Sequence, residues 1–130
     1  MGLAMAQQIL KQGHHLLTIA RQSNADLQAL AHAHHAPLTQ WQHDLGAPHA
    51  AAAQLQQWLG TLSADTFSRA VLINNAGAIP PIAPLSHRDC QAISQALRVG
   101  LEAPMLLTSA FLQATEGWLL PRQVLNVSSG

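Results

Sequence analysis

The sequence predicts an α/β protein built on a doubly wound parallel sheet with helices on both faces. Helical and strand patterns alternate along its 130 residues in the order α-β-α-β-α-β-α-β. The clearest strand, residues 69–74 (RAVLIN), holds three consecutive large apolar residues, as expected where a strand is buried on both faces. Alternating helices and strands favour parallel pairing, and such sheets bind ligands beyond the carboxyl ends of their strands.

The first half of the chain begins inside a helix. Apolar residues at helical spacing indicate a helix that ends at Gly13, followed by a buried strand at 15–20. Ser23, followed by the acid Asp26, resembles the N-cap of a second helix, which Pro37 must end.

The next strand, residues 38–43, alternates, so that Leu38, Gln40 and Gln42 share one side. Pro48 suits the first turn of a third helix. That helix is expected to carry an apolar side made of Ala52, Leu55 and Leu59.

In the second half, Ser86 is the expected cap of a long helix, with the acid Asp89 three residues later. Pro104 should kink this helix, because proline lacks an N–H and clashes with the carbonyl group of Gly100. The last strand is expected at residues 123–127 (QVLNV).

Composition excludes several classes of function. Only 9% of the residues are charged, and six basic residues balance six acidic ones, so the chain has no electrostatic footprint for nucleic acid or an anionic membrane. No apolar run is long enough to span a bilayer, and no signal peptide is indicated. The single cysteine, Cys90, favours a reducing, cytoplasmic location. The clustered histidines are spaced unsuitably for a shared metal ion, so no metal site is predicted.

The strongest motif is the run Asn74, Asn75, Ala76 and Gly77, directly after the RAVLIN strand. Gly77 would let a ligand approach the backbone closely, and the asparagine side chains could tie the strand end to its neighbours. Taken alone, the run could also be an ordinary turn at the end of a strand.

This NNAG run resembles the internal fingerprint of the short-chain dehydrogenase/reductase family, whose fold is of the Rossmann type. The resemblance extends to Asp44 and Leu45, which match the family's Asp-Leu/Val pair, and implies that Asp44 accepts a hydrogen bond from the cofactor's adenine. Without the resemblance, Asp44 would more simply be a solvated loop residue. Asn126-Val127-Ser128-Ser129 resembles the family's NxSS segment, which implies that Ser129 is the catalytic serine that polarises the substrate carbonyl or alcohol.

Further cofactor contacts follow from the same resemblance. Gly2 is similar to the last glycine of the family's phosphate-binding loop, and Leu3 follows it at the start of the first helix. Val99 lies in the matching segment of the long helix. Arg21 stands where NAD-specific sites usually place an acid, so NADP is the expected cofactor and NAD the alternative. An exposed loop arginine without a ligand is an equally simple explanation of Arg21.

Two departures from the family matter. Gly100 occupies the position of an asparagine that supports the family's proton relay. The chain contains no tyrosine, so the family's Tyr-x-x-x-Lys pair is absent from it. We therefore expect residues 1–130 to be a partial NAD(P)-binding Rossmann domain, truncated at both ends and inactive alone.

The missing parts also have a structural consequence. The family's first, central strand is not present, so strands 15–20 and 38–43 should pair on one side of its place, and strands 69–74 and 123–127 on the other. Their unpaired edges predict a marginally stable or insoluble chain, which a cooperative thermal melt of the monomer would contradict.

The resemblance implies a parent enzyme that transfers a hydride between NADP(H) and a small-molecule carbonyl/alcohol substrate, as a homo-oligomer. The alternative is a non-catalytic Rossmann-fold binding or interaction module, to which Gly100 gives weight. Another α/β fold, such as a flavodoxin-like domain, is disfavoured by the order of NNAG, Asp-Leu and NVSS.

Overall fold

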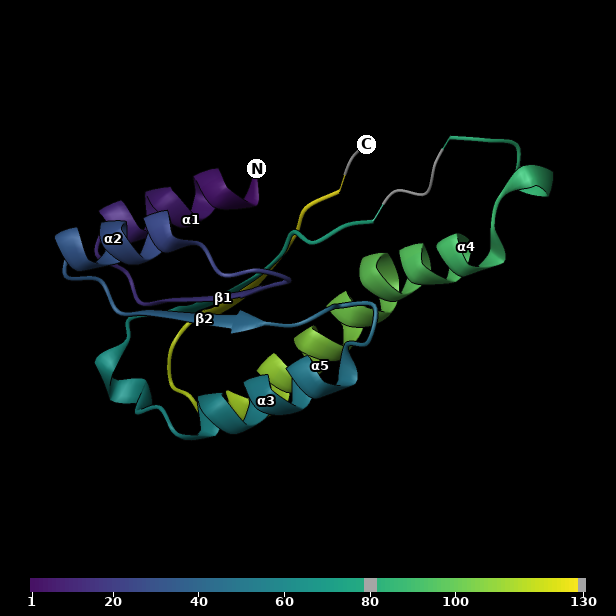
Figure 1. Ribbon diagram of the computed structural model, residues 1–130. Coiled ribbons are helices and arrows are strands. Elements are labelled where there is room, and N and C mark those ends of the chain that lie inside the picture. Colours follow the sequence, from purple (N-terminus) through teal and green to yellow (C-terminus); the bar gives the residue numbers. More distant parts are fainter. Residues whose placement is uncertain (79–81, 129–130) are drawn as a thin grey trace. The chain divides into compact units, whose positions relative to one another are not determined.

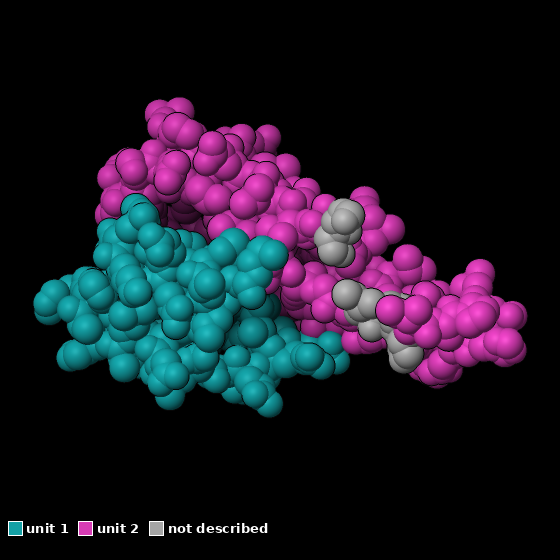
Figure 2. Space-filling view, turned by 90° about the horizontal axis from the view of Figure 1, so that it is seen from above, with its two compact units in different colours: residues 1–44 teal, residues 45–130 magenta. Residues whose placement is uncertain are grey.

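The computed structural model describes residues 1–78 and 82–128 of the chain. The chain forms two compact units, unit 1 (Met1–Asp44) and unit 2 (Leu45–Gly130), which are coloured separately in Figure 2. Each unit contains one parallel two-stranded sheet: β1 pairs with β2 in unit 1, and β3 pairs with β4 in unit 2 (Figure 1). The pairing of strands expected from the sequence is confirmed.

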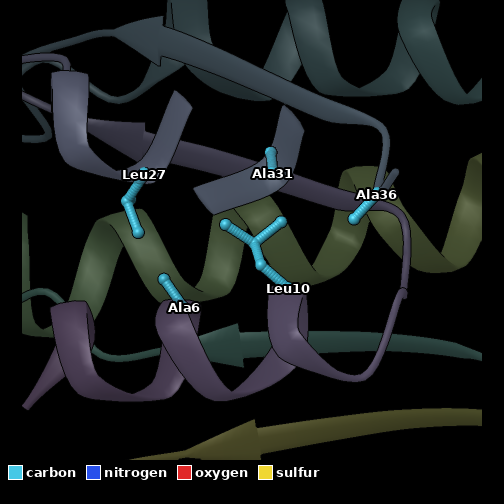
Figure 3. Packing of buried hydrophobic residues seen from close by; sticks show 5 residues of the cluster. All are labelled: Ala6, Leu10, Leu27, Ala31 and Ala36. Carbon is cyan, nitrogen blue, oxygen red and sulfur yellow. The ribbon is translucent and has the colours of Figure 1, made fainter. Parts of the chain in front are cut away.

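Unit 1 packs two helices together with its sheet. Its elements are α1 (Gly2–Lys11), β1 (Leu16–Ala20), α2 (Ala25–Ala33) and β2 (Leu38–Gln42). The core lies between the helices, where the buried side chains point toward one another (Figure 3); these are Ala6, Leu10, Leu27, Ala31 and Ala36. Because most of them are alanines, the helices can approach closely, and the two buried leucines, Leu10 and Leu27, supply most of the apolar volume.

Both helices of unit 1 end in the same kind of turn. After α1, the amides of Gly13 and His14 donate to the carbonyl groups of Leu10 and Ile9. Gly13 adopts a φ of 77°, the left-handed conformation that such an ending requires, so the predicted stop at Gly13 is confirmed.

The ending of α2 uses a different residue in the same place. His35, with a φ of 52°, takes the left-handed position, and the amide of Ala36 donates to the carbonyl group of Ala31 at 2.9 Å. The predicted start of α2 is wrong by one residue: Asn24, not Ser23, is the N-cap, and its side chain accepts a hydrogen bond from the Leu27 amide at 3.1 Å.

Unit 2 contains the remaining elements. Its helices and strands are α3 (His49–Gly60), β3 (Ala70–Asn74), α4 (Cys90–Leu97), α5 (Ala103–Ala114) and β4 (Arg122–Asn126). Two short 3-10 turns, η1 (Ala64–Thr66) and η2 (Leu85–His87), and a π-helical segment, η3 (Arg98–Glu102), complete it.

The helices α3 and α5 lie side by side and form the core of unit 2 (Figure 1). Their buried residues include Leu55 and Leu59 on α3, and Leu107 and Phe111 on α5. The predicted apolar side of α3 is correct except at its start, where Ala51 is buried and Ala52 is only half-buried.

The long helix differs from the prediction at two points. Its N-cap is Asp89, which accepts a hydrogen bond from the Gln91 amide, whereas Ser86 lies in the separate turn η2. The expected distortion at Pro104 takes the form of the π-helical segment directly before α5. A wider turn there accommodates the missing N–H and the bulk of the proline ring.

Candidate functional site

In unit 1, Arg21 and Asp44 follow the carboxyl ends of two neighbouring strands. Ala20 is the register partner of Gln42, and the His43 amide donates to the Ala20 carbonyl group at 2.9 Å. Both side chains are exposed. Among residues 1–78 and 82–128, Arg21 makes no ion pair, so its guanidinium group is available to an anion.

The amino end of α1 is at the same edge of unit 1, because α1 runs antiparallel to β1 and a short turn joins them (Figure 1). Gly2 and Leu3 are the first residues of this helix. Met1, the N-cap, makes no side-chain cap hydrogen bond, and the first turn holds no acidic residue. Such a helix end suits an anionic group, for example a phosphate group.

In unit 2, Asn74 ties together the elements at the carboxyl edge of the sheet. The residue is 9% exposed, and its Nδ2 donates to Asn126 Oδ1 at 2.8 Å and to Thr108 Oγ1 at 3.2 Å. The Val127 amide donates to the Asn74 carbonyl group at 2.9 Å. The sequence-based expectation that an asparagine of the NNAG run joins the strand end to its neighbours is confirmed for Asn74.

The rest of the NNAG run leads away from β3 into open space. Asn75 is half-buried, and Ala76 and Gly77 are exposed. A β-carbon at Gly77 would meet no atom within 4 Å among the described residues, and its φ lies outside the left-handed region. Among the described residues, neither backbone conformation nor a protein neighbour therefore requires glycine here.

The remaining candidates of unit 2 differ in accessibility. Val99 is 8% exposed and lies within η3, whereas Leu45 is half-buried. Next to Leu45, Gly46 faces the carboxamide of Gln95 so closely that a β-carbon would overlap it. Ser129 lies outside the described residues, and the exposed Ser128 is the last described residue after β4.

Two residues at the edge of unit 1 were not among the predicted site residues. Gln40 bonds to the backbone of Asn24, and Gln42 bonds to Ser23, so both contact the turn that follows Arg21. The alternation of β2 placed them on one side of the strand, but the sequence did not show which turn they would meet.

Other features of unit 2 lie away from the carboxyl edge. A small pocket of about 210 Å³, lined by residues such as Phe67 and Leu119, lies near the amino ends of β3 and β4. Within the described residues, no group of three or more His, Cys, Asp or Glu side chains is placed to hold a metal ion. No helix in the described part of the chain is long and apolar enough to cross a membrane.

The family model described as "short chain dehydrogenase" matches residues 1–130. The benzil reductase ((S)-benzoin forming) of Bacillus cereus is 30% identical over 130 residues, which are 100% of this chain and 52% of that protein.

Solved structures agree on the fold. A short-chain dehydrogenase/reductase from Burkholderia vietnamiensis is 32% identical with a TM-score of 0.80, covering 100% of this chain and 58% of that one. A metagenomic short-chain oxidoreductase in complex with NADP is 27% identical with a TM-score of 0.79, covering 99% of this chain and 56% of that one.

Fold and sequence together define a partial Rossmann-type α/β fold. The chain belongs to the short-chain dehydrogenase/reductase family. It spans about half the length of the curated relatives that it matches.

Proposed function

We propose that this chain is the cofactor-binding half of an NADP-dependent oxidoreductase that acts on a small-molecule carbonyl/alcohol pair. The observation that carries the proposal is Arg21, which is exposed at the carboxyl end of β1 and has no ion-pair partner among the described residues. No acidic residue lies between Gly13 and Asn24 to hold an unmodified ribose instead. The NADP complex of the similar metagenomic oxidoreductase also supports this cofactor.

Each unit contributes its own binding groups to the proposal. In unit 1, Gly2 and Leu3 offer helix N–H groups to the pyrophosphate, Arg21 binds the 2′-phosphate, and Asp44 accepts from the adenine amino group.

In unit 2, Leu45 and Val99 provide apolar contacts to the adenine side of the cofactor. Asn75, Ala76 and Gly77 form the open strand end along which the cofactor can approach the backbone.

The bound nicotinamide would supply or accept the hydride, and Ser129 would donate a hydrogen bond to the substrate oxygen as negative charge develops on it. Proton exchange needs a further acid/base group, which the family draws from tyrosine and which this chain does not contain. Residues 1–130 alone are therefore inactive in this proposal, and turnover requires the remainder of a family member.

The proposal includes the organisation of the parent enzyme. Residues 1–130 form part of one NAD(P)-binding domain, and the enzyme is a cytoplasmic homo-oligomer. The long helix supports self-association, because Leu97, Leu101 and Met105 are exposed at 58%, 57% and 64%. The single cysteine supports a reducing compartment.

Cofactor titration of the native protein that carries this chain tests the proposal. We expect NADPH to bind more tightly than NADH, and Arg21→Ala to weaken NADPH binding by about tenfold or more, the loss of one charge-assisted hydrogen bond. Arg69→Ala is the matched control, because Arg69 is exposed just before the amino end of β3. Equal affinity for NADPH in the wild type and Arg21→Ala would refute the assigned role of Arg21.

A non-catalytic binding module is the second candidate, favoured by Gly100 in the place of the family's asparagine. Turnover distinguishes the two. The enzyme reduces a carbonyl compound with consumption of NADPH, whereas the module binds its ligand and shows no turnover in the native protein.

A further inference from the structure

The turn between β1 and α2, residues 21–24, is the segment that carries Arg21. Arg21, Gln22 and Ser23 are exposed, so the packed core of unit 1 does not fix them. An arginine recognises a phosphate well only when its backbone is held in place, because each freely rotating group loses conformational entropy on binding. What holds this turn therefore affects how well Arg21 can select a phosphate.

Gln40, in the middle of β2, makes two hydrogen bonds to Asn24, the last residue of this turn, through the oxygen and the nitrogen of its carboxamide. The Asn24 amide donates to Gln40 Oε1 at 2.9 Å, and Gln40 Nε2 donates to the Asn24 carbonyl group at 3.0 Å. Two bonds between one planar carboxamide and the backbone of one residue fix its orientation as well as its distance. The interaction thus imitates the pairing of a neighbouring strand.

Gln42 adds a second contact from the same side of β2. Its Nε2 donates to Ser23 Oγ at 3.3 Å. Because Gln40 and Gln42 are two residues apart on a strand, they share one face of the sheet and meet successive residues of the turn. The start of the turn is tied as well, by the bond from the His43 amide to the Ala20 carbonyl group.

The chemistry of these two side chains also matters. Both are neutral, so they hold the turn without placing a negative charge beside Arg21. A glutamate at position 40 could accept the same hydrogen bond from the Asn24 amide, and one at position 42 could accept from the Ser23 hydroxyl, but either would repel an approaching phosphate. Neutral side chains at positions 40 and 42 are thus suited to a ligand with a phosphate at this end, whereas negatively charged side chains would oppose its binding.

We infer that Gln40 and Gln42 are positioning residues that hold the turn of Arg21 and thereby set the preference for a 2′-phosphorylated nicotinamide cofactor over the unphosphorylated one. The inference rests on the proposed function, since it concerns the same cofactor. It assigns part of the cofactor preference to two residues of β2, whereas Arg21, which would contact the phosphate, follows the neighbouring strand β1.

The test measures dissociation constants for NADPH and NADH in the native protein that carries this chain. Gln40→Met keeps the length of the side chain and removes both hydrogen bonds. We expect NADPH binding to weaken by about 3- to 10-fold, the range for loss of a hydrogen bond or two, while NADH binding stays within about twofold. Gln42→Glu should lower the NADPH preference further, because it adds the opposing charge.

The matched control is Gln8→Met, the same change at an exposed position of α1. The ratio of the two dissociation constants is the decisive readout, since general destabilisation of unit 1 weakens both cofactors alike. In an Arg21→Ala background, Gln40→Met should leave this ratio unchanged, because the inference has Gln40 act through Arg21.

Two results would overturn the inference. One is an unchanged ratio in Gln40→Met, which includes an equal loss for both cofactors, and the other is a shift of the ratio that persists without Arg21. A native protein that binds neither cofactor would overturn the proposed function and this inference together. Tight NADPH binding that is insensitive to Gln40 would overturn this inference alone.

Discussion

Carboxamide side chains hold the carboxyl edge of the sheet in both units, but in different surroundings. In unit 1, Gln40 is half-buried, Gln42 is exposed, and both hold a surface turn. In unit 2, Asn74 is 9% exposed and joins β4 and α5 from within. A buried amide must keep its partners, whereas water can replace those of an exposed one. Loss of the amide is therefore expected to cost more stability at the edge of unit 2 than at the exposed Gln42 of unit 1.

Among the substitutions that test this difference, Asn74→Ala should have the largest effect on the free energy of unfolding. The change leaves Thr108 and Asn126 without their donor and removes a buried side chain, so the free energy of unfolding should fall by about 1–3 kcal/mol. Urea unfolding of the native protein, followed by tryptophan fluorescence, measures it.

The control for this prediction is Gln42→Ala in unit 1, which removes one exposed hydrogen bond and should cost no more than about 0.5 kcal/mol. Equal losses in the two variants would show that burial does not distinguish the two edges.

Much of the structure at these two edges could be predicted from the sequence, because the patterns that indicate it are local. The apolar run before Asn74 identified β3, and NNAG identified the strand end that Asn74 ties to β4. The period-two alternation of β2 placed Gln40 and Gln42 on one face. Gly13 was correctly expected to end α1, since a left-handed residue there favours glycine.

What the sequence did not predict depends on contacts between distant residues or on competition between neighbouring ones. Gln40 meets Asn24 across two elements, and no pattern within β2 specifies that partner. Ser23 and Asn24 are both good caps, and so are Ser86 and Asp89, so the choice between them follows from where each helix can begin to pack.

The ends of α1 and α2 can also be compared, because each has one residue in the left-handed conformation. Gly13→Ala places a β-carbon in the left-handed region and should lower the free energy of unfolding by about 1–2 kcal/mol. His35→Gly is its counterpart at the end of α2, and it should stabilise unit 1 by up to about 1 kcal/mol, because glycine adopts that φ without strain. Urea denaturation measures both. Opposite signs are expected, and a destabilising His35→Gly would mean that the imidazole makes a contribution larger than the strain.

A small effect, opposite in sign to that of Gly13→Ala, is expected at Gly100 in unit 2, which differs from Gly13 in its backbone conformation. Its φ lies outside the left-handed region, and a β-carbon would meet no atom within 4 Å among the described residues. Gly100→Ala should therefore raise the free energy of unfolding by about 0.5–1 kcal/mol, because alanine loses less backbone entropy in a helix.

Gly100→Asn restores the family's residue, and its β-carbon would meet no atom within 4 Å among the described residues. Thermal unfolding of both variants beside the wild type checks this pair. A lower melting temperature in Gly100→Ala would show that η3 needs the flexibility of glycine, for instance to form the π-helical turn before Pro104. If Gly100→Ala is stabilising, the fold of the described part of unit 2 does not require glycine at position 100.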